Sequence, residues 1–170
     1  QKILKNISNK INVVPSEINI HKTISKILQT RKKSVDDGLN IDWSTAESLA
    51  FGSLLDEGFP VRFVGQDSGR GTFSQRHSVL RDQTNNFRYI PLNNISKNQK
   101  KFEIVDSFLS ELAVLGFEYG YSLVEPNTLT LWEAQFGDFA NGAQVVIDQF
   151  IASGERKWFR ASGLVLLLPH

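Results

Sequence analysis

The chain has 170 residues, of which 41% are hydrophobic and 22% are charged, a composition typical of a soluble globular protein rather than of disordered, fibrous or membrane-spanning classes. Nineteen Lys and Arg residues against eighteen Asp and Glu residues give a formal net charge of +1, so bulk charge does not indicate a nucleic-acid partner. The absence of cysteine excludes disulfides and thiolate chemistry, and three scattered histidines disfavour a zinc site made by side chains alone.

The first forty residues are rich in Lys, Asn and Ser and predict a solvated helical lead-in. Isoleucine and leucine residues over 20–28 recur at helical spacing, and Gly38 is expected to end this helix. The basic stretch 31–33 could contact phosphate. Late in a helix it also complements the helix dipole, which is the interpretation we favour.

A second helix is expected next, because Ser44 and Glu47 match the S-x-x-E capping box and apolar residues repeat behind them on one face. Gly58 and Pro60 are expected to stop it. The following segment VRFVG (61–65) predicts a short buried strand.

The loop GQDSGRGTFSQRH (65–77) follows at the strand end, where functional loops are common. Its glycines suggest a dinucleotide fingerprint, but the G-x-G-x-x-G spacing is missing and no helix opens from the loop, so flexible turns explain them better. Arg76 and His77 close the loop in a cationic, donor-rich stretch suited to an anionic group. A surface histidine would explain the same residues equally well.

Three further strands are predicted after a polar connection over 82–101 that contains the short extended piece YIPL. They are FEIVDS (102–107), TLTLWEAQ (128–135) and LVLLL (164–168). Helical segments separate these strands, and parallel neighbours need long crossovers. We therefore expect an α/β fold with a mostly parallel sheet flanked by helices.

Two helices are expected between these strands. The residues expected on the buried face of the first helix, LSELAVLGFEYGYS, are Leu109, Leu112, Ala113, Gly116, Phe117 and Gly120. The second helix is expected from Asp138 to Ser153, with Gly154 closing it. Its predicted core face is Phe139, Ala143, Val146, Ile147 and Phe150.

Three residues near these helix starts invite a chemical interpretation. Glu111 lies in a first helical turn after Ser110, where a glutamate usually only complements the helix dipole, and the residues alone reveal no partner for it. Phe136 and Phe139 fit either a core or a wall that stacks on a planar ring. At this point the packing and the catalytic interpretations both stay open.

Four segments resemble a known family: GQDSGRGTFSQRH, LSELAVLGFEYGYS, LWEAQFGDFANGAQVVIDQFIASGE and GLVLLLPH. They are similar to the thiamine-diphosphate-dependent first component of the 2-oxoglutarate dehydrogenase complex, and WEAQFGDFANGAQ separates this family from transketolases and pyruvate dehydrogenases. The resemblance covers residues 40–170. It implies a helical lead-in over 1–40 and a three-layer, transketolase-like pyrimidine-binding domain over 41–170, truncated at its C-terminal side and cut from a longer subunit.

The resemblance also implies roles for particular residues. Glu111 would hydrogen-bond the aminopyrimidine ring nitrogen of thiamine diphosphate and exchange a proton with it, while Phe136 or Phe139 stacks on the ring, with Phe136 marginally preferred. His77 and Arg76 would lie toward the active-site mouth. Magnesium and the diphosphate would be held by a domain that is not in this chain. The implied reaction is oxidative decarboxylation of 2-oxoglutarate with succinyl transfer to lipoyl.

The implied partners are the remainder of the subunit, a second copy in a homodimer and the lipoyl-bearing succinyltransferase component. The implied location is the bacterial cytoplasm or the mitochondrial matrix, with neither a nucleic-acid nor a membrane partner, and the isolated piece is expected to be inactive. Gln66 and Gln75 stand where the family often has an acid and a histidine, so no role of that histidine carries over. Two alternatives stay open: a non-catalytic α/β interaction module, and a related thiamine enzyme that acts on another 2-oxo acid.

Overall fold

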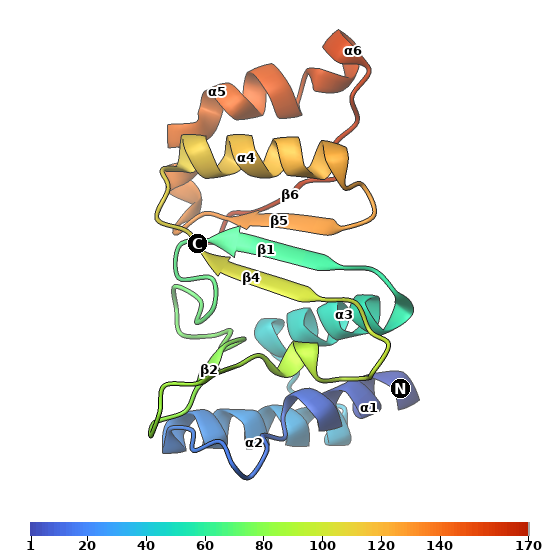
Figure 1. Ribbon diagram of the computed structural model, residues 1–170, viewed down its shortest axis with the longest axis vertical. Helices are drawn as coiled ribbons and strands as arrows, with labels where there is room; N and C mark the ends of the chain where they lie inside the picture. The colour runs from blue at the N-terminus through green and yellow to red at the C-terminus, as the bar shows by residue number, and fades with distance from the viewer. Residues whose placement is uncertain (170) are drawn as a thin grey trace. The chain divides into compact units, whose positions relative to one another are not determined.

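The computed structural model describes residues 1–169, and the chain forms two compact units (Figure 1). The helical unit comprises Gln1–Gly58 and Gly69–Phe102, and the sheet unit comprises Phe59–Ser68 and Glu103–His170. Each unit is thus assembled from two separate stretches of the chain. The predicted division into a lead-in and a domain after residue 40 stays a prediction.

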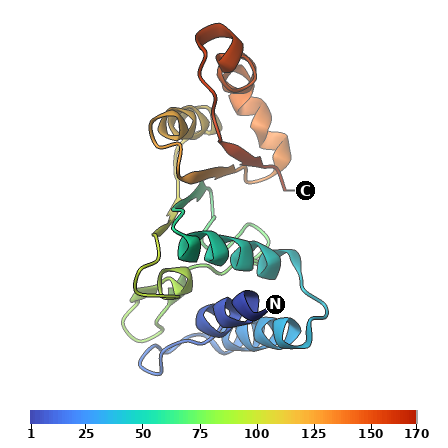
Figure 2. The ribbon, with the colours of Figure 1, turned by 90° about the vertical axis from the view of Figure 1, so that its right-hand side faces the viewer.

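Three helices build the helical unit: α1 (Lys2–Ile11), α2 (Lys22–Asp37) and α3 (Trp43–Glu57). Helix α1 packs against both of the others, and Figure 2 shows α1 and α2 side by side near the N-terminus. Gly38 (φ 70°) ends α2 and Gly58 (φ 98°) ends α3, both in the left-handed conformation that favours glycine. These two predicted helix ends are confirmed.

The start of α3 differs from the predicted capping box. Asp42 is the N-cap, and its Oδ1 accepts a hydrogen bond from the Thr45 amide at 2.7 Å. Ser44 is buried inside the first turn, and the Glu47 carboxylate pairs with Arg76 instead of reaching back to the cap. The capping-box prediction was wrong because Asp42 is an equally good cap two residues earlier.

The three basic residues 31–33 of α2 lie in different environments. Arg31 is buried, whereas Lys32 and Lys33 form surface ion pairs one turn ahead with Asp36 and Asp37. The stretch does not reach the last turn of α2, so the predicted complement to the helix dipole was wrong. The partners of Arg31 are the backbone carbonyls of Gln75 and Arg76.

A small antiparallel hairpin completes the helical unit, with strands β2 (Leu80–Arg81) and β3 (Arg88–Tyr89) followed by the 3-10 helix η1 (Pro91–Asn93). The sequence predicted only an extended piece over YIPL, which is wrong from Pro91 onward because proline opens a helical turn there.

The sheet unit contains a four-stranded sheet in the order β4-β1-β5-β6. The strands are β1 (Val61–Gly65), β4 (Phe102–Asp106), β5 (Leu129–Glu133) and β6 (Val165–Leu167). Strands β1 and β5 are parallel, as are β5 and β6, with Gly65 opposite Glu133 and Glu133 opposite Leu167. The predicted strands and the mostly parallel sheet with flanking helices are confirmed.

Helix α4 (Glu111–Val124) packs against β5 and against the irregular helical segment that follows this strand. That segment runs through the 3-10 helix η2 (Gly137–Ala143), α5 (Gln144–Val146) and the π-helix η3 (Ile147–Ile151), with α6 (Gly154–Trp158) after it. The predicted regular helix from Asp138 to Ser153 was wrong, since this region begins inside the 3-10 helix η2, which holds Gly137 and Gly142, and glycine weakens an α-helix. Gly154 begins α6 rather than ending a helix. Within residues 1–169, no helix is both long and apolar enough to cross a membrane.

The buried face of α4 is not the predicted one. Leu112 is 46% exposed and Phe117 is 59% exposed, whereas Val114, Leu115 and Glu118 are buried. Both sides of this helix are apolar, so the helical period alone could not select the inner side, and its one central acid points inward. We call the exposed set Leu112, Ala113 and Phe117 the outer face of α4. Of the face predicted for the following segment, Ala143 and Val146 are buried, but Phe139 and Phe150 are more than 40% exposed.

Candidate functional site

Three strands of the parallel sheet end beside one another, and the residues that follow them line a small hollow. We call it the sheet-edge hollow; its lining includes Gly65, Gln66, Ser107, Glu111, Glu133 and Gln135. Its volume is about 10 Å³, the room of about one water molecule. Ligands of open α/β sheets bind outside the carboxyl ends of the strands, so this edge is the expected place for a site.

Glu111 is one of the two acids in this lining, beside Glu133, and it is the first residue of α4. Ser110 caps the helix by accepting a hydrogen bond from the Ala113 amide at 3.4 Å, which sets the helix start that carries Glu111. The Gln66 side chain donates its Nε2 hydrogen to Glu111 Oε1 at 3.4 Å. The carboxylate therefore has a partner that the sequence did not reveal, because Gln66 lies 45 residues away.

Gly65 brings the end of β1 against the backbone of β5. A Cβ atom at this position would lie 2.4 Å from the Glu133 carbonyl oxygen and 2.7 Å from Ser68 Oγ, so only glycine fits. The Gly65 carbonyl accepts a hydrogen bond from the Ser107 amide at 2.8 Å. This close approach places Gln66 next to the first turn of α4.

Two phenyl rings follow the end of β5 in the same unit. The ring centroids of Phe136 and Phe139 are 6.0 Å apart with the planes tilted by 58°. Phe139 is 49% exposed, so its ring has a free face instead of the core position predicted for it. The structure thus groups Glu111, Phe136 and Phe139 in the sheet unit.

Arg76 and His77 belong to the helical unit. The Arg76 side chain is 3% exposed, and its Nε donates to Glu47 Oε1 at 2.6 Å while its Nη2 donates to Oε2 at 3.3 Å. The backbone carbonyls of Gln75 and Arg76 both accept hydrogen bonds from the Arg31 guanidinium. The predicted cationic stretch is therefore embedded in side-chain contacts, and neither Arg31 nor Glu47 was among the predicted site residues.

His77 is half-buried at the end of this stretch, with a left-handed φ of 51°. Its backbone amide donates to the Arg70 carbonyl at 3.0 Å. Burial lowers the pKa of the His77 imidazole below its ordinary value, and the positive charges of Arg31 and Arg70 lower this pKa further. The ring is therefore neutral at neutral pH.

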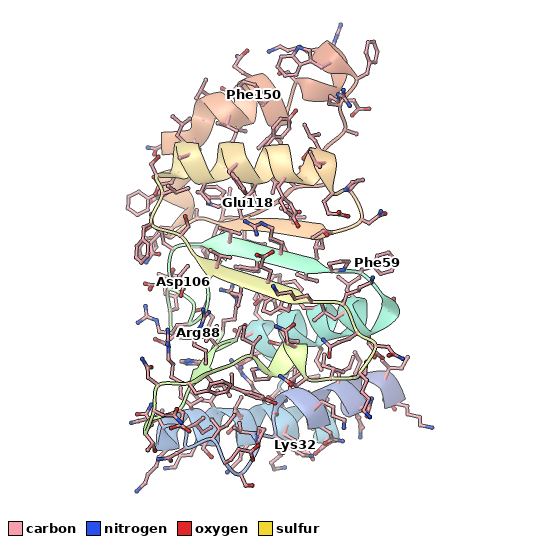
Figure 3. All side chains as sticks on the ribbon, in the orientation of Figure 1. Lys32, Phe59, Arg88, Asp106, Glu118 and Phe150 are labelled. Atoms are coloured by element: carbon pink, nitrogen blue, oxygen red, sulfur yellow. The ribbon has the colours of Figure 1, made fainter. Side chains whose placement is uncertain are left out.

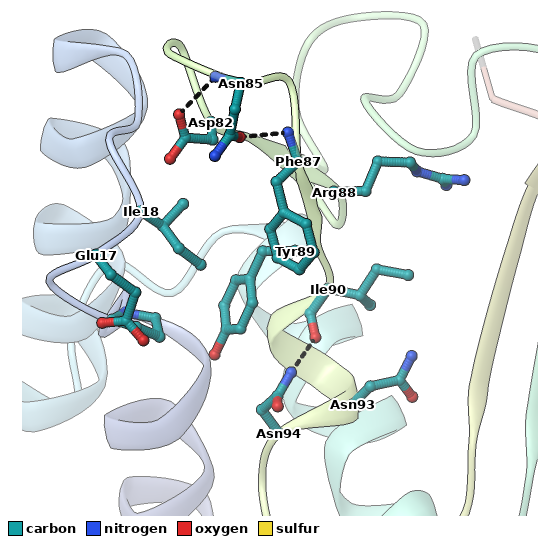
Figure 4. Close-up of a pocket in the computed structure, with 11 residues that line it drawn as sticks. Glu17, Ile18, Asp82, Asn85, Phe87, Arg88, Tyr89, Ile90, Asn93 and Asn94 are labelled. Carbon is teal, nitrogen blue, oxygen red and sulfur yellow. Dashed lines mark hydrogen bonds between the residues drawn. The ribbon is translucent and has the colours of Figure 1, made fainter.

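A separate groove in the helical unit has a volume of about 780 Å³ (Figure 4). Glu17, Asp82 and Tyr89 are among its lining residues, and the described lining contains none of the predicted site residues. The Asp82 carboxylate in this groove accepts two backbone hydrogen bonds, from Asn19 in the α1–α2 connection at 3.0 Å and from Thr84 in the hairpin turn at 2.6 Å. The Asp82 carboxylate of this groove is thus used by the fold.

Comparison with known proteins identifies the domain. The family described as "Transketolase, pyrimidine binding domain" matches residues 40–170. The chain belongs to this family. The 2-oxoglutarate dehydrogenase E1 components of Brucella ovis, Brucella canis and Brucella anthropi are each 64% identical to it over 169 residues, which is 99% of the chain. The chain spans 17% of the length of each of these relatives. The predicted resemblance is confirmed.

In this transketolase pyrimidine-binding domain, a buried ion pair joins α4 to the sheet. Arg62 of β1 bonds the Glu118 carboxylate through two nitrogens and Glu103 through a third, at 2.9 Å. Figure 3 shows Glu118 on α4, between that helix and the sheet. Neither Arg62 nor Glu118 was among the predicted site residues, and an acid within an otherwise apolar helix was the signal that could have revealed the pair.

Proposed function

We propose that the chain is the pyrimidine-binding part of a thiamine-diphosphate-dependent 2-oxoglutarate dehydrogenase. The observation that carries the proposal is Glu111 at the carboxyl edge of a parallel sheet, in a chain 64% identical to E1 components over 99% of its length. The parent protein would decarboxylate 2-oxoglutarate oxidatively and transfer the succinyl group to a lipoyl group. We propose the bacterial cytoplasm as its location, as the three Brucella relatives are bacterial.

The groups at the sheet edge suit an aminopyrimidine ring. Glu111 supplies a carboxylate that can share a proton with a ring nitrogen, and Gln66 supplies an amide that holds this carboxylate. Phe136 or Phe139 supplies an apolar face for stacking on the ring, and the half-exposed Phe139 ring has that face free. The sheet unit thus holds a carboxylate for proton exchange, an amide that positions it and phenyl rings that can stack, which together suit such a ring.

Within this proposal, each residue of the edge has one task. When bound, thiamine diphosphate supplies the electron sink for decarboxylation. Gln66 engages Oε1 of Glu111, which leaves Oε2 as the atom that exchanges a proton with the ring nitrogen. The first-turn position of Glu111 stabilises the carboxylate between transfers, because the helix N-terminus favours negative charge. We propose that magnesium and the diphosphate are held by another part of the parent.

The mouth of the site is proposed to include His77 and Arg76. His77 would contact the substrate as a neutral imidazole, whose ring nitrogens can both accept and donate hydrogen bonds. Arg76 would act through its pairing with Glu47, which fixes the segment that ends at His77.

The outer face of α4 supports a partner surface. Leu112 and Phe117 expose 46% and 59% of their area next to Leu109, which is 52% exposed. Apolar side chains that gather on one helix face mark an interaction surface. We propose that a second copy in a homodimer covers this face, and that the remainder of the subunit and the lipoyl-bearing succinyltransferase component are further partners.

The test uses the full-length parent and an artificial electron acceptor, so that no lipoyl partner is needed. Glu111→Gln should lower turnover of 2-oxoglutarate on the order of 100-fold or more, since the amide cannot exchange the proton. Glu125→Gln, at the exposed end of the same helix, is the matched control and should keep wild-type turnover. Circular dichroism checks that both variants fold.

Two results would contradict the proposal. Unchanged turnover in Glu111→Gln would return this glutamate to a simple helix-start charge. A wild-type parent that does not turn over 2-oxoglutarate would favour an interaction module, or another 2-oxo acid if one of those is consumed.

A further inference from the structure

Helix α2 lies before the residues matched by the family, yet it reaches the segment that ends at His77. Arg31 is 7% exposed, and its Nη1 donates to the Arg76 carbonyl at 3.0 Å while its Nη2 donates to the Gln75 carbonyl. One planar guanidinium thus holds two consecutive carbonyl groups.

A second contact holds the same segment through a side chain. The Glu47 carboxylate of α3 receives two hydrogen bonds from the buried Arg76 guanidinium. Residues 75 and 76 are therefore fixed by α2 through their backbone and by α3 through the Arg76 side chain.

The segment needs such support because its backbone is strained on both sides. Ser74 and His77 have φ values of 54° and 51°, in the left-handed region that non-glycine residues rarely adopt. Such a conformation is unfavourable for a residue with a side chain, and it persists only when its surroundings fix it. The two charged contacts supply that fixation immediately before His77.

We propose that Arg31 and Glu47 are positioning residues that hold His77 in its substrate-facing conformation, so that the lead-in helix α2 is part of the active-site machinery. The inference rests on the proposed function for the role of His77. The contacts that carry it lie wholly within the helical unit.

The first measurement is structural and does not require activity. Arg31→Lys keeps the positive charge but loses the fork that reaches two carbonyls. Amide hydrogen exchange over residues 74–78 of the full-length parent should become about tenfold faster in this variant, a loss of about 1.4 kcal/mol of local protection. Lys32→Ala, on the same helix turn with its partner Asp36 on the surface, is the matched control and should leave this exchange unchanged.

The second measurement separates positioning from general stability. In the full-length parent, Arg31→Lys and Glu47→Gln should each lower kcat/KM for 2-oxoglutarate on the order of 10-fold or more, because misplacing a substrate contact is costly. In a His77→Ala background the same substitutions should cost less than about twofold, since their effect passes through His77. Glu47→Gln keeps the test valid if Arg31→Lys fails to fold.

The outcomes are distinguishable. The positioning role would be overturned if Arg31→Lys and Glu47→Gln lowered kcat/KM equally with His77 present and in the His77→Ala background. Unchanged hydrogen exchange over 74–78 in Arg31→Lys would overturn it as well. The Arg31→Lys variant could show faster exchange while the wild-type parent does not turn over 2-oxoglutarate at all. That result would support the contacts of Arg31 and Glu47 with residues 75 and 76 as the support of this segment, but it would refute the proposed function.

Discussion

Arg62 of β1 donates two hydrogen bonds to the buried carboxylate of Glu118 on α4, from Nε to Oε2 at 2.7 Å and from Nη2 to Oε1 at 2.8 Å. The Tyr121 ring lies 4.7 Å from the guanidinium carbon. The pairing with Glu118 raises the pKa of Arg62 above its ordinary value. This bidentate contact fixes the rotation of α4 about its axis, and the same helix begins with Glu111.

Breaking this pair from one side should be costly. Glu118→Ala leaves the largely buried Arg62 without its main partner, and we expect a loss of about 3–5 kcal/mol in the free energy of unfolding. Glu103→Ala removes only the more exposed partner and should cost about 1 kcal/mol or less. Urea unfolding checks both values, and equal costs for the two variants would contradict the assignment of Glu118 as the main partner.

Substituting alanine for two glycines should change the stability of the protein in opposite directions. Gly65→Ala forces a Cβ atom to within 2.4 Å of the Glu133 carbonyl oxygen and should destabilise the protein by about 1–3 kcal/mol. Gly120→Ala, inside α4 with nothing within 4 Å of its Cβ, should stabilise it by up to about 1 kcal/mol. Thermal unfolding of the two variants measures the difference. A stabilising Gly65→Ala would show that the end of β1 does not approach β5 so closely.

His77 should make stability depend on pH. Its folded pKa is lowered by burial and by the charges of Arg31 and Arg70, whereas the unfolded imidazole titrates near its ordinary value of about 6.5. The unfolded chain therefore binds the proton more readily. Stability should fall as the pH drops through about 6.5 and continue to fall until the folded pKa is reached.

The measurement for His77 compares urea midpoints at pH 7.5 and pH 5.5. His77→Gln should lose less stability between these two values than the wild-type chain, because it removes the group whose protonation favours unfolding. Identical pH dependence in the two proteins would show that the His77 pKa is not lowered by folding.

The outer face of α4 gives a prediction about assembly. Phe117→Asp should convert the proposed homodimer of the full-length parent to monomers, because a charge would enter an apolar contact. Val13→Asp, at a position that is 53% exposed outside α4, is the control and should keep the dimer. Sedimentation velocity measures both, and a dimeric Phe117→Asp variant would exclude this face as the dimer contact.

The sheet was predictable because each strand is a short apolar run bounded by turn residues. VRFVG matches β1 residue for residue, and FEIVDS extends only one residue past β4. Local patterns of this kind need no knowledge of distant partners. Gly38 and Gly58 were predictable for the same reason.

The contacts of the candidate site were not predictable, because they join distant residues. Gln66 donates a hydrogen bond to Glu111, which lies 45 residues later in the sequence, and Arg31 donates one to the Arg76 carbonyl, also 45 residues later. In sequence, Arg31 looks like its neighbour Lys32, yet one is buried and the other has a surface partner. Only the folded structure shows that these two neighbouring cations have different environments.

The order of segments along the chain has a consequence for folding during synthesis. All residues of the helical unit have been made once Phe102 is added, whereas most of the sheet unit is still to come. Strand β1 is made before either of its neighbours, β4 and β5, and its buried Val61 and Val64 must wait for them. We therefore expect nascent chains to acquire protected helices first, with β1 exposed as an unpaired edge that a chaperone can recognise until β5 emerges.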